Sequence, residues 1–404
     1  MRLLLLTCGT EGDTRPIAAL GHALAGAGHA MQLLADAATV DIGRQLGLRS
    51  DALPGDVRSA IATEGAMRDI TRNLARLTNA NTPAWLAQAI DAGRGCDAVV
   101  MSGLAAFVGL SAAEALGVPA IGAMMIPITP TAAFGSPLLP FAPPRMLNRA
   151  SHQLVNQLVW RTFRRSTNRA RAAAGLPPRR SLWTGHPVLY GVSPALLPPT
   201  PDWPPDNVAC GQWRTPQGAW TPPAELLAFL SAGEPPAYVG FGSMAGFDNA
   251  RVLQAVTGAF GRRRVLFNAG WTGIDTAALP RNFHPVGHVP HDWLLPRTSL
   301  VVHHGGSGTT HSACRAGVPS VVVPFAGDQF FWAARMRGAG VMRDTLRGAS
   351  ITGDALGNAV AFAGGDAARA AARQLGERMR HEDGNATAVA MIERIVAGTP
   401  RDGG

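Results

Sequence analysis

Short apolar runs recur along the chain and alternate with segments in which apolar residues repeat every three or four positions. The runs form two sets, at residues 2–7, 30–35, 98–101 and 120–125, and at residues 237–241, 265–268, 300–302 and 320–325. Such runs are typical of strands buried on both faces. Helices are predicted between or after them, at residues 14–26, 39–47, 105–116, 149–180, 225–231, 309–316, 330–337 and 354–397. The alternation predicts an α/β fold with parallel sheets.

A proline-rich segment divides the two sets of strands. Prolines recur from Pro194 to Pro223, where few regular elements can form. With 404 residues, of which 47% are hydrophobic, the chain is long enough to bury two cores. We therefore expect one domain at residues 1–200 and a second at residues 201–384.

The chain is basic, and its net charge of +9 comes from 36 arginines without a single lysine. A basic patch with interleaved aromatic residues and a recognised nucleic-acid motif are both missing, so we expect no nucleic-acid partner. The predicted helix at 149–180 carries many of the arginines. Two interpretations of it stay open: a solvated face, or a surface that contacts anionic lipid at the membrane periphery.

The cysteines and the apolar segments bear on the cellular setting. Four cysteines are scattered without a CxxC pair, which predicts neither a zinc site nor a disulfide framework and fits a reducing, cytoplasmic environment. The apolar run at residues 3–6 is too short for a signal peptide. Because no run approaches the ~18 apolar residues of a membrane helix, we expect no transmembrane segment.

The segment from Val301 to Gln329 carries the clearest chemistry. A buried strand ends in two histidines and runs into a turn rich in glycine, and a helix follows from Thr309. Unpaired N–H groups and the helix dipole favour an anion at such a turn. Asp328 and Gln329 follow the next strand, at the sheet edge where open α/β folds bind ligands. The pattern predicts a phosphate or diphosphate site beside groups that bind hydroxyls.

Asp13 stands at the corresponding turn after the first strand. It lies at or beside the start of the predicted helix, so on position alone it is a capping carboxylate. The alternative is a general base.

Two further segments suggest an apolar substrate. The loop at residues 126–144 is apolar and broken by prolines, and residues 56–95 contain helical material that could form the wall of a cleft. Ordinary core packing is the alternative for each side chain. The acceptor-binding candidates are Trp85, Met124, Phe134 and Phe141.

Several of these motifs together resemble the signature of family-1 glycosyltransferases with the GT-B fold. They are GTEGDTRP at residues 9–16, GHVPHDWLLP at 287–296, HHGGSGTT at 303–310, RAGVP at 315–319 and GDQ at 327–329. The HHGG and VPHDW forms are most similar to bacterial macrolide, glycopeptide and sterol-type enzymes. The resemblance implies two Rossmann-like domains that face each other across a cleft, with the helix of residues 385–404 packing back on the first domain.

The resemblance also implies roles for individual residues. Asp13 would deprotonate the acceptor hydroxyl in an inverting transfer of a hexose from a UDP- or dTDP-sugar to a hydrophobic small molecule. The donor-binding residues would be Gly12, Ser243, Trp271, His288, Val289, His304, Gly306, Ser307, Gly308, Thr309, Asp328 and Gln329. No cofactor and no metal are expected, since no DxD motif occurs. The chain departs from plant relatives at His288, where they have tryptophan, and at Ser312, where they have a carboxylate.

Three other kinds of function compete with this one. A dinucleotide-dependent oxidoreductase lacks support, because GxGxxG does not follow the first strand. A nucleotide-sugar epimerase or a lipid-carrier glycosyltransferase of the same fold, and a non-catalytic sugar-nucleotide-binding partner, stay open. For the oligomeric state we expect either a monomer or a homodimer.

Overall fold

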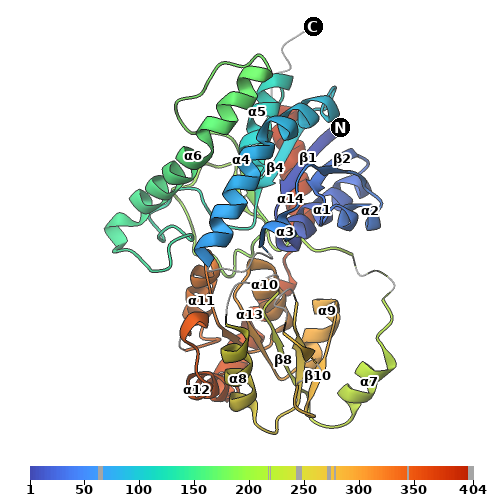
Figure 1. Ribbon diagram of the computed structural model, residues 1–404, viewed down its shortest axis with the longest axis vertical. Coiled ribbons are helices and arrows are strands. Elements are labelled where there is room, and N and C mark those ends of the chain that lie inside the picture. Colours follow the sequence, from blue (N-terminus) through green and yellow to red (C-terminus); the bar gives the residue numbers. More distant parts are fainter. Residues whose placement is uncertain are drawn as a thin grey trace.

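The protein consists of two α/β domains stacked along its long axis (Figure 1). The computed structural model describes residues 1–61, 67–216, 218, 220–242, 248–270, 274–276, 279–343 and 345–398. Each domain has a parallel sheet between layers of helices, which confirms the predicted fold class. Within the described ranges, none of the helices combines the length and apolarity needed to span a bilayer.

The first domain is built on a seven-stranded sheet in the order β3-β2-β1-β4-β5-β6-β7. The strands are β1 (Arg2–Cys8), β2 (Ala30–Asp36), β3 (Arg49–Leu53), β4 (Ala98–Gly103), β5 (Ala120–Met124), β6 (Val188–Tyr190) and β7 (Asn207–Ala209). The helices are α1 (Glu11–Gly26), α2 (Asp41–Gln45), α3 (Val57–Ile61), α4 (Met67–Ala92), α5 (Ala106–Leu116) and α6 (Asn148–Ala173), with the 3₁₀ turn η1 (Arg145–Leu147) before α6. The strand order reverses beside β1, which opens a crevice at its carboxyl end.

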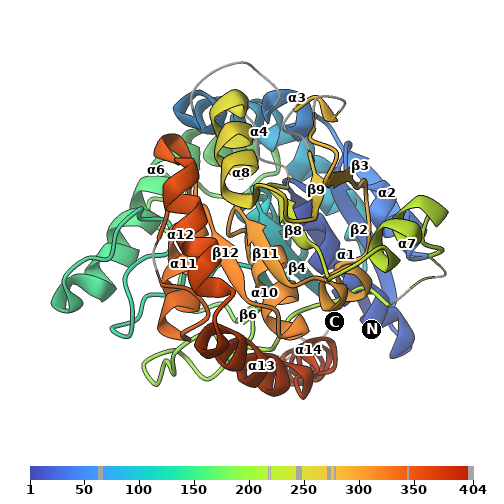
Figure 2. The ribbon, with the colours of Figure 1, turned by 90° about the horizontal axis from the view of Figure 1, so that it is seen from below.

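The second domain has a five-stranded sheet in the order β10-β9-β8-β11-β12. The strands are β8 (Ala237–Gly240), β9 (Val265–Asn268), β10 (Phe283–Pro285), β11 (Leu300–His303) and β12 (Ser320–Val322). The helices are α7 (Ala224–Ser231), α8 (Asn249–Phe260), α9 (His291–Leu294), α10 (Ser307–Ala316), α11 (Gln329–Gly338), α12 (Gly353–Ala363) and α13 (Asp366–Arg380). The pairs α8/α12 and α10/α13 pack on opposite faces of this sheet (Figure 2).

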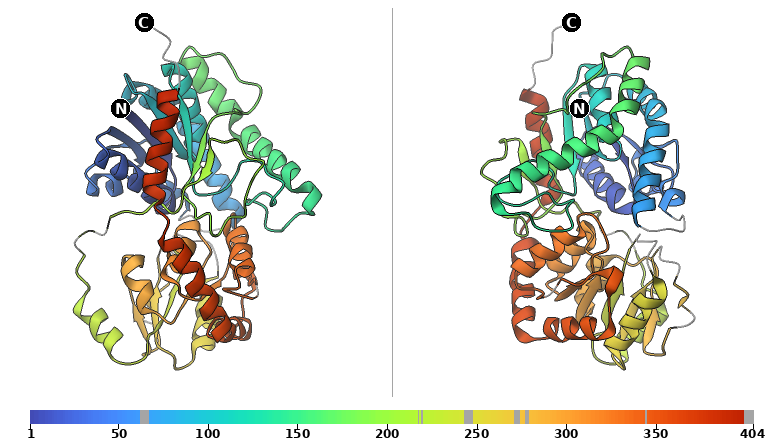
Figure 3. Two further views of the ribbon diagram at one scale, coloured as in Figure 1. Left: turned by 180° about the vertical axis from the view of Figure 1, so that it is seen from behind. Right: turned by 60° about the vertical axis from the view of Figure 1, so that its left-hand side comes forward.

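The last helix, α14 (Gly384–Gly398), returns to the first domain and packs along α1 (Figure 3). Its buried residues Ala388, Ile392 and Val396 join the core that contains Leu3 and Leu5 of β1. The first sheet includes β7, so it extends past the boundary predicted at residue 200.

Candidate active site

The carboxyl ends of both sheets open onto one large cavity between the domains. Its volume is about 1900 Å³, and its walls include the start of α1 from the first domain and the start of α10 from the second. Asp13 and the glycine-rich turn therefore lie in the same cavity although almost 300 positions separate them in sequence.

Asp13 both caps α1 and faces this cavity. Its Oδ2 accepts hydrogen bonds from the Thr10 backbone N–H at 2.8 Å and the Thr10 hydroxyl at 3.3 Å, which completes a capping box. Burial raises the pKa of Asp13, and the Thr10 bonds oppose that rise. A Cβ on Gly9 would lie only 2.2 Å from Oδ2, so the position before Thr10 requires glycine. Since Thr10 uses Oδ2 alone, Oδ1 is left to accept a proton.

The N-terminus of α10 forms the opposite wall. Gly306 is its N-cap residue and supplies no side-chain cap, so the N–H groups of Ser307, Gly308 and Thr309 have no helical acceptor. All three residues line the cavity. A Cβ on Gly306 would lie 2.4 Å from Nε2 of His304, so only glycine lets the turn close over this histidine. The turn offers N–H donors and a helix dipole to an anion.

The two histidines before this turn have different environments. His303 is buried in the sheet, and its Nδ1 accepts a hydrogen bond from the Gly305 N–H at 3.1 Å. His304 lines the cavity. Burial, with a smaller contribution from the charge of His291, lowers the pKa of His304 to about 4. His304 is therefore neutral near pH 7 and acts in the free protein as a hydrogen-bonding group, not as a cation.

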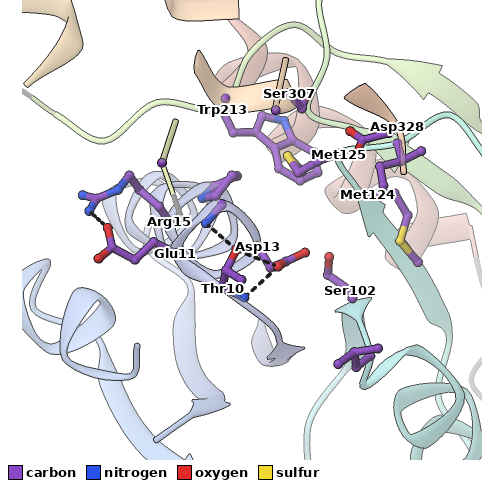
Figure 4. Close-up of a pocket in the computed structure, with 18 of the residues that line it drawn as sticks. Thr10, Glu11, Asp13, Arg15, Ser102, Met124, Met125, Trp213, Ser307 and Asp328 are labelled. Atoms are coloured by element: carbon purple, nitrogen blue, oxygen red, sulfur yellow. Dashed lines mark hydrogen bonds and ion pairs between the residues drawn. The ribbon is translucent and has the colours of Figure 1, made fainter. Parts of the chain in front are cut away.

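Asp328 extends the same wall from the loop before α11. Its Oδ2 accepts a hydrogen bond from Trp332 Nε1 at 2.8 Å. Burial raises the pKa of Asp328 to about 6, and the negative charge of Asp13 adds to the rise. Figure 4 shows these two carboxylates, from different domains, facing the same space. The neighbouring Gln329 also lines the cavity, but its Oε1 is used by the backbone N–H groups of Phe325 and Ala326.

Comparison with known proteins decides the family. Over 436 aligned residues the chain is 36% identical to O-mycaminosyltylonolide 6-deoxyallosyltransferase from Streptomyces fradiae, with 99% of this chain and 100% of that protein covered. Residues 258–394 match the model for the C-terminal domain of erythromycin biosynthesis protein CIII-like proteins. The chain belongs to the family-1 glycosyltransferases.

A sterol 3-beta-glucosyltransferase of Candida albicans is 32% identical to this glycosyltransferase over 96% of the chain. The match covers only 27% of that longer protein. The glycotransferase of kitacinnamycin, at 19% identity, superposes with a TM-score of 0.73 over 98% of this chain and 99% of its own. Glycosyltransferase VinC, in complex with dTDP, gives 0.69 over 99% of this chain and 100% of its own, again at 19% identity. These likenesses show the GT-B fold.

The remaining donor-side predictions divide into two groups. Gly12, His288 and Val289 line the cavity, and His288 is exposed to solvent. The Nη2 atom of Arg15 approaches His288 Nε2 at 3.0 Å, so α1 contacts this loop directly. Ser243 and Trp271 lie outside the residues that the structure describes.

Three of the four residues predicted to bind the acceptor lie away from the cavity wall. Trp85 is fully buried in the first-domain core, and its Nε1 donates to the Pro54 carbonyl at 2.7 Å. Phe134 packs in a buried cluster against His152 and Phe331. Phe141 is 62% exposed and is not part of the cavity wall. Met124, at the end of β5, does line the cavity.

Aromatic residues from three separate segments line the cavity instead. Phe107 of α5 packs against Phe163 of α6, with 6.1 Å between ring centroids, and against Trp183 at 6.2 Å. All three line the cavity, as does Trp213 in the interdomain linker (Figure 4). Trp213 lies in the proline-rich segment between the domains, and this position is the one feature of the sequence that could have pointed to it. Phe107 and Phe163 carry none, because each lies within an ordinary helical repeat.

Proposed function

We propose that this glycosyltransferase moves a hexosyl group from a UDP- or dTDP-sugar to a hydroxyl of a hydrophobic small molecule, with inversion at the anomeric carbon. The observation that carries the proposal is the shared cavity, in which Asp13 faces the bare N-terminus of α10. A carboxylate and an anion site on opposite walls suit an acceptor hydroxyl and a leaving diphosphate.

The donor would bind along the second domain. The N–H groups of Ser307, Gly308 and Thr309 would hold the diphosphate, and neutral His304 would donate a further hydrogen bond. Asp328 would accept from the sugar hydroxyls beside them, in a cavity that Gln329 also lines. Support for dTDP comes from the complex of VinC, which shares the fold.

In the reaction, the acceptor oxygen would attack the anomeric carbon as Asp13 Oδ1 takes its proton. The bond between that carbon and the diphosphate oxygen breaks, and its electron pair leaves with the nucleoside diphosphate. A raised pKa makes Asp13 a stronger base than an ordinary aspartate, and general-base catalysis of this kind contributes ~10²–10⁴ in rate. With the base and the diphosphate site on opposite walls, attack would come from the face opposite the leaving group, which would invert the configuration.

Charge on the departing diphosphate would be stabilised by donors at the helix terminus. Preorganised N–H groups in a site that excludes water are among the largest contributions to catalysis. Among the residues that the structure describes, no cluster of three His, Cys, Asp or Glu side chains could hold a metal ion. Unchanged turnover in the presence of EDTA is the result expected for a metal-independent reaction.

The acceptor would lie against the aromatic wall of Phe107, Phe163 and Trp183. Aliphatic residues such as Met124 and Leu138 line the cavity as well, so an apolar skeleton is favoured over a sugar or peptide. The relatives are named for a macrolide and for sterols, and a polyketide, macrolide or sterol alcohol is the proposed class.

The experiment is a two-stage assay. Thermal denaturation with UDP, dTDP and their glucose conjugates identifies the donor, since a ligand at 100 times its Kd stabilises the native state by about 2.7 kcal/mol. The preferred nucleotide sugar is then incubated with and without a macrolide or sterol acceptor. Sugar transfer only when the acceptor is present, with a β-linkage formed from an α-linked donor, supports the proposal. Epimerised donor without acceptor, or a strict need for a polyprenyl phosphate carrier, contradicts it.

A further inference from the structure

The charge of the chain is concentrated in one segment. Residues 115–201 contain nine arginines and no aspartate or glutamate. The rest of the chain holds 27 of the 36 basic side chains and all 27 acidic ones, so its formal charge cancels. The whole net charge of +9 therefore belongs to this segment, which contains the apolar loop and α6.

The same segment carries the exposed apolar surface. Of the six large apolar side chains exposed among the described residues, five lie between residues 141 and 158. They are Phe141 at 62% exposure, Met146 at 89%, Leu147 at 49%, Leu154 at 61% and Leu158 at 50%. The loop before α6 and the start of α6 project from the body of the first domain (Figures 1 and 3). We name residues 141–158 the apolar tip.

Arginines continue the exposed face of α6 beyond the apolar tip. Leu154, Leu158, Arg161, Arg165 and Arg169 follow one another at intervals of three or four residues, so they share one side of the helix. Arg161, Arg164, Arg165 and Arg169 form no ion pair with any described residue. Arg171, in contrast, is buried and paired with Glu114 at 2.7 Å. The exposed arginines are left for an external anion.

We propose that this face docks on an anionic phospholipid membrane, with the apolar tip inserted at the acyl boundary and the α6 arginines on the headgroups. A projecting apolar tip followed by unpaired cations matches the two attractions that hold peripheral helices at such surfaces. A solvated face would not need five exposed apolar side chains beside them.

Docking also places the cavity at the membrane. Leu158 is exposed in the apolar tip and at the same time lines the cavity, as does Val159 beside it. An apolar acceptor dissolved in the bilayer can therefore reach the aromatic wall without crossing water. This delivery role rests on the proposed function, whereas the docking itself does not.

Co-sedimentation with vesicles tests the docking in the absence of any substrate. The full chain is mixed with vesicles of phosphatidylglycerol and phosphatidylcholine in equal parts, or of phosphatidylcholine alone. The expected result is binding to the anionic vesicles that weakens with salt. Met146→Ser with Leu154→Ser should abolish binding, and Arg161→Gln with Arg165→Gln should weaken it about 25-fold, at roughly fivefold for each arginine near the surface. None of these four residues lines the cavity.

Matched controls lie in the second domain, where Leu227 is also an exposed apolar residue and Arg262 and Arg263 are adjacent exposed arginines. Leu227→Ser and Arg262→Gln with Arg263→Gln should bind vesicles like the unmodified protein.

Equal binding to both vesicle types, no binding, or equal losses in the controls would overturn the proposal. The proposal would also be overturned if the protein formed a dimer in solution that Leu154→Ser dissociates, and did not bind vesicles. Turnover of an acceptor dissolved with cyclodextrin should be the same in all variants, which separates a failure of docking from a failure of the proposed function.

Discussion

The guanidinium of Arg15 and the imidazole of His288 meet across the cavity, with 3.0 Å between Nη2 and Nε2. Arginine can only donate, so the ring nitrogen of His288 accepts. Arg15 belongs to the first turns of α1, two residues after Asp13, and His288 belongs to the loop after β10 in the second domain. The contact therefore joins the helix that carries the proposed base to the proposed nucleotide-binding loop.

Arg15→Gln should loosen this junction and weaken donor binding. Both side chains have solvent access, so the loss is about 0.5–1 kcal/mol, a two- to fivefold rise in the Kd of the nucleotide sugar. Isothermal titration calorimetry measures it. Arg44→Gln, which breaks an exposed ion pair with Asp41 inside the first domain, is the control and should leave the Kd unchanged.

The glycine-rich turn gives a second prediction. Gly306→Ala places a methyl group within contact distance of the His304 ring and must displace it, which should lower affinity for the nucleoside diphosphate by roughly tenfold or more. Gly308→Ala meets open space and should leave the melting temperature of the free protein unchanged or slightly raised. Comparable melting temperatures combined with normal affinity for Gly306→Ala would show that the turn does not bind the diphosphate.

Asp328 should lower the stability of the free protein at neutral pH. Its folded-state pKa of about 6 lies above the ordinary value of 3.8, so the folded protein holds this proton more tightly than the unfolded chain and stability falls as pH rises between these values. Asp328→Asn removes the buried charge and keeps an acceptor for Trp332. It should stabilise the protein at pH 7 by at most about 3 kcal/mol, and this gain should vanish near pH 4.

Denaturant titrations at the two pH values measure the effect of Asp328→Asn. Asp69→Asn removes an exposed carboxylate of α4 that is paired with Arg72, and it should show no gain at either pH. A stabilisation of Asp328→Asn that is equal at pH 7 and pH 4 would mean that the charge is not its cause.

Substitutions of Met124 and Trp85 should distinguish an effect on acceptor binding from an effect on core packing. Met124→Ala enlarges the proposed acceptor end and should raise the KM of the acceptor by roughly tenfold, as expected for a lost apolar contact. Trp85→Phe leaves the Pro54 carbonyl without its donor and should cost about 1–3 kcal/mol of stability while the acceptor KM stays the same. Steady-state kinetics with thermal denaturation distinguishes them, and a KM effect of Trp85→Phe would contradict the core position of this side chain.

The sequence predicted the parts of the molecule that depend on local pattern. Apolar runs such as β1 and the strand, turn and helix around Gly306 are local signals, and both lie where they were predicted. Strand β3 was missed because Arg49–Leu53 mixes charged and apolar residues, and β10 because it has three residues and ends in proline.

The proposed acceptor wall could not be predicted in the same way. Trp85 and Phe134 are apolar residues in plausible segments, but which face of a helix or loop meets the cavity depends on packing between distant segments. Phe107 and Trp183 lie together only because α5 and the segment after α6 pack side by side. A single sequence does not show how these segments pack, so it cannot distinguish a side chain of the core from one that lines the cavity.

Asp13→Asn separates the two proposed roles, the base on the first domain and the donor site on the second. Asparagine can still accept the Thr10 N–H bond, so α1 should stay capped and the melting temperature should hardly change. We expect a fall in kcat of ~10²–10⁴ with an unchanged Kd for the nucleotide sugar. Retained turnover, or loss of donor affinity equal to the loss of rate, would contradict it.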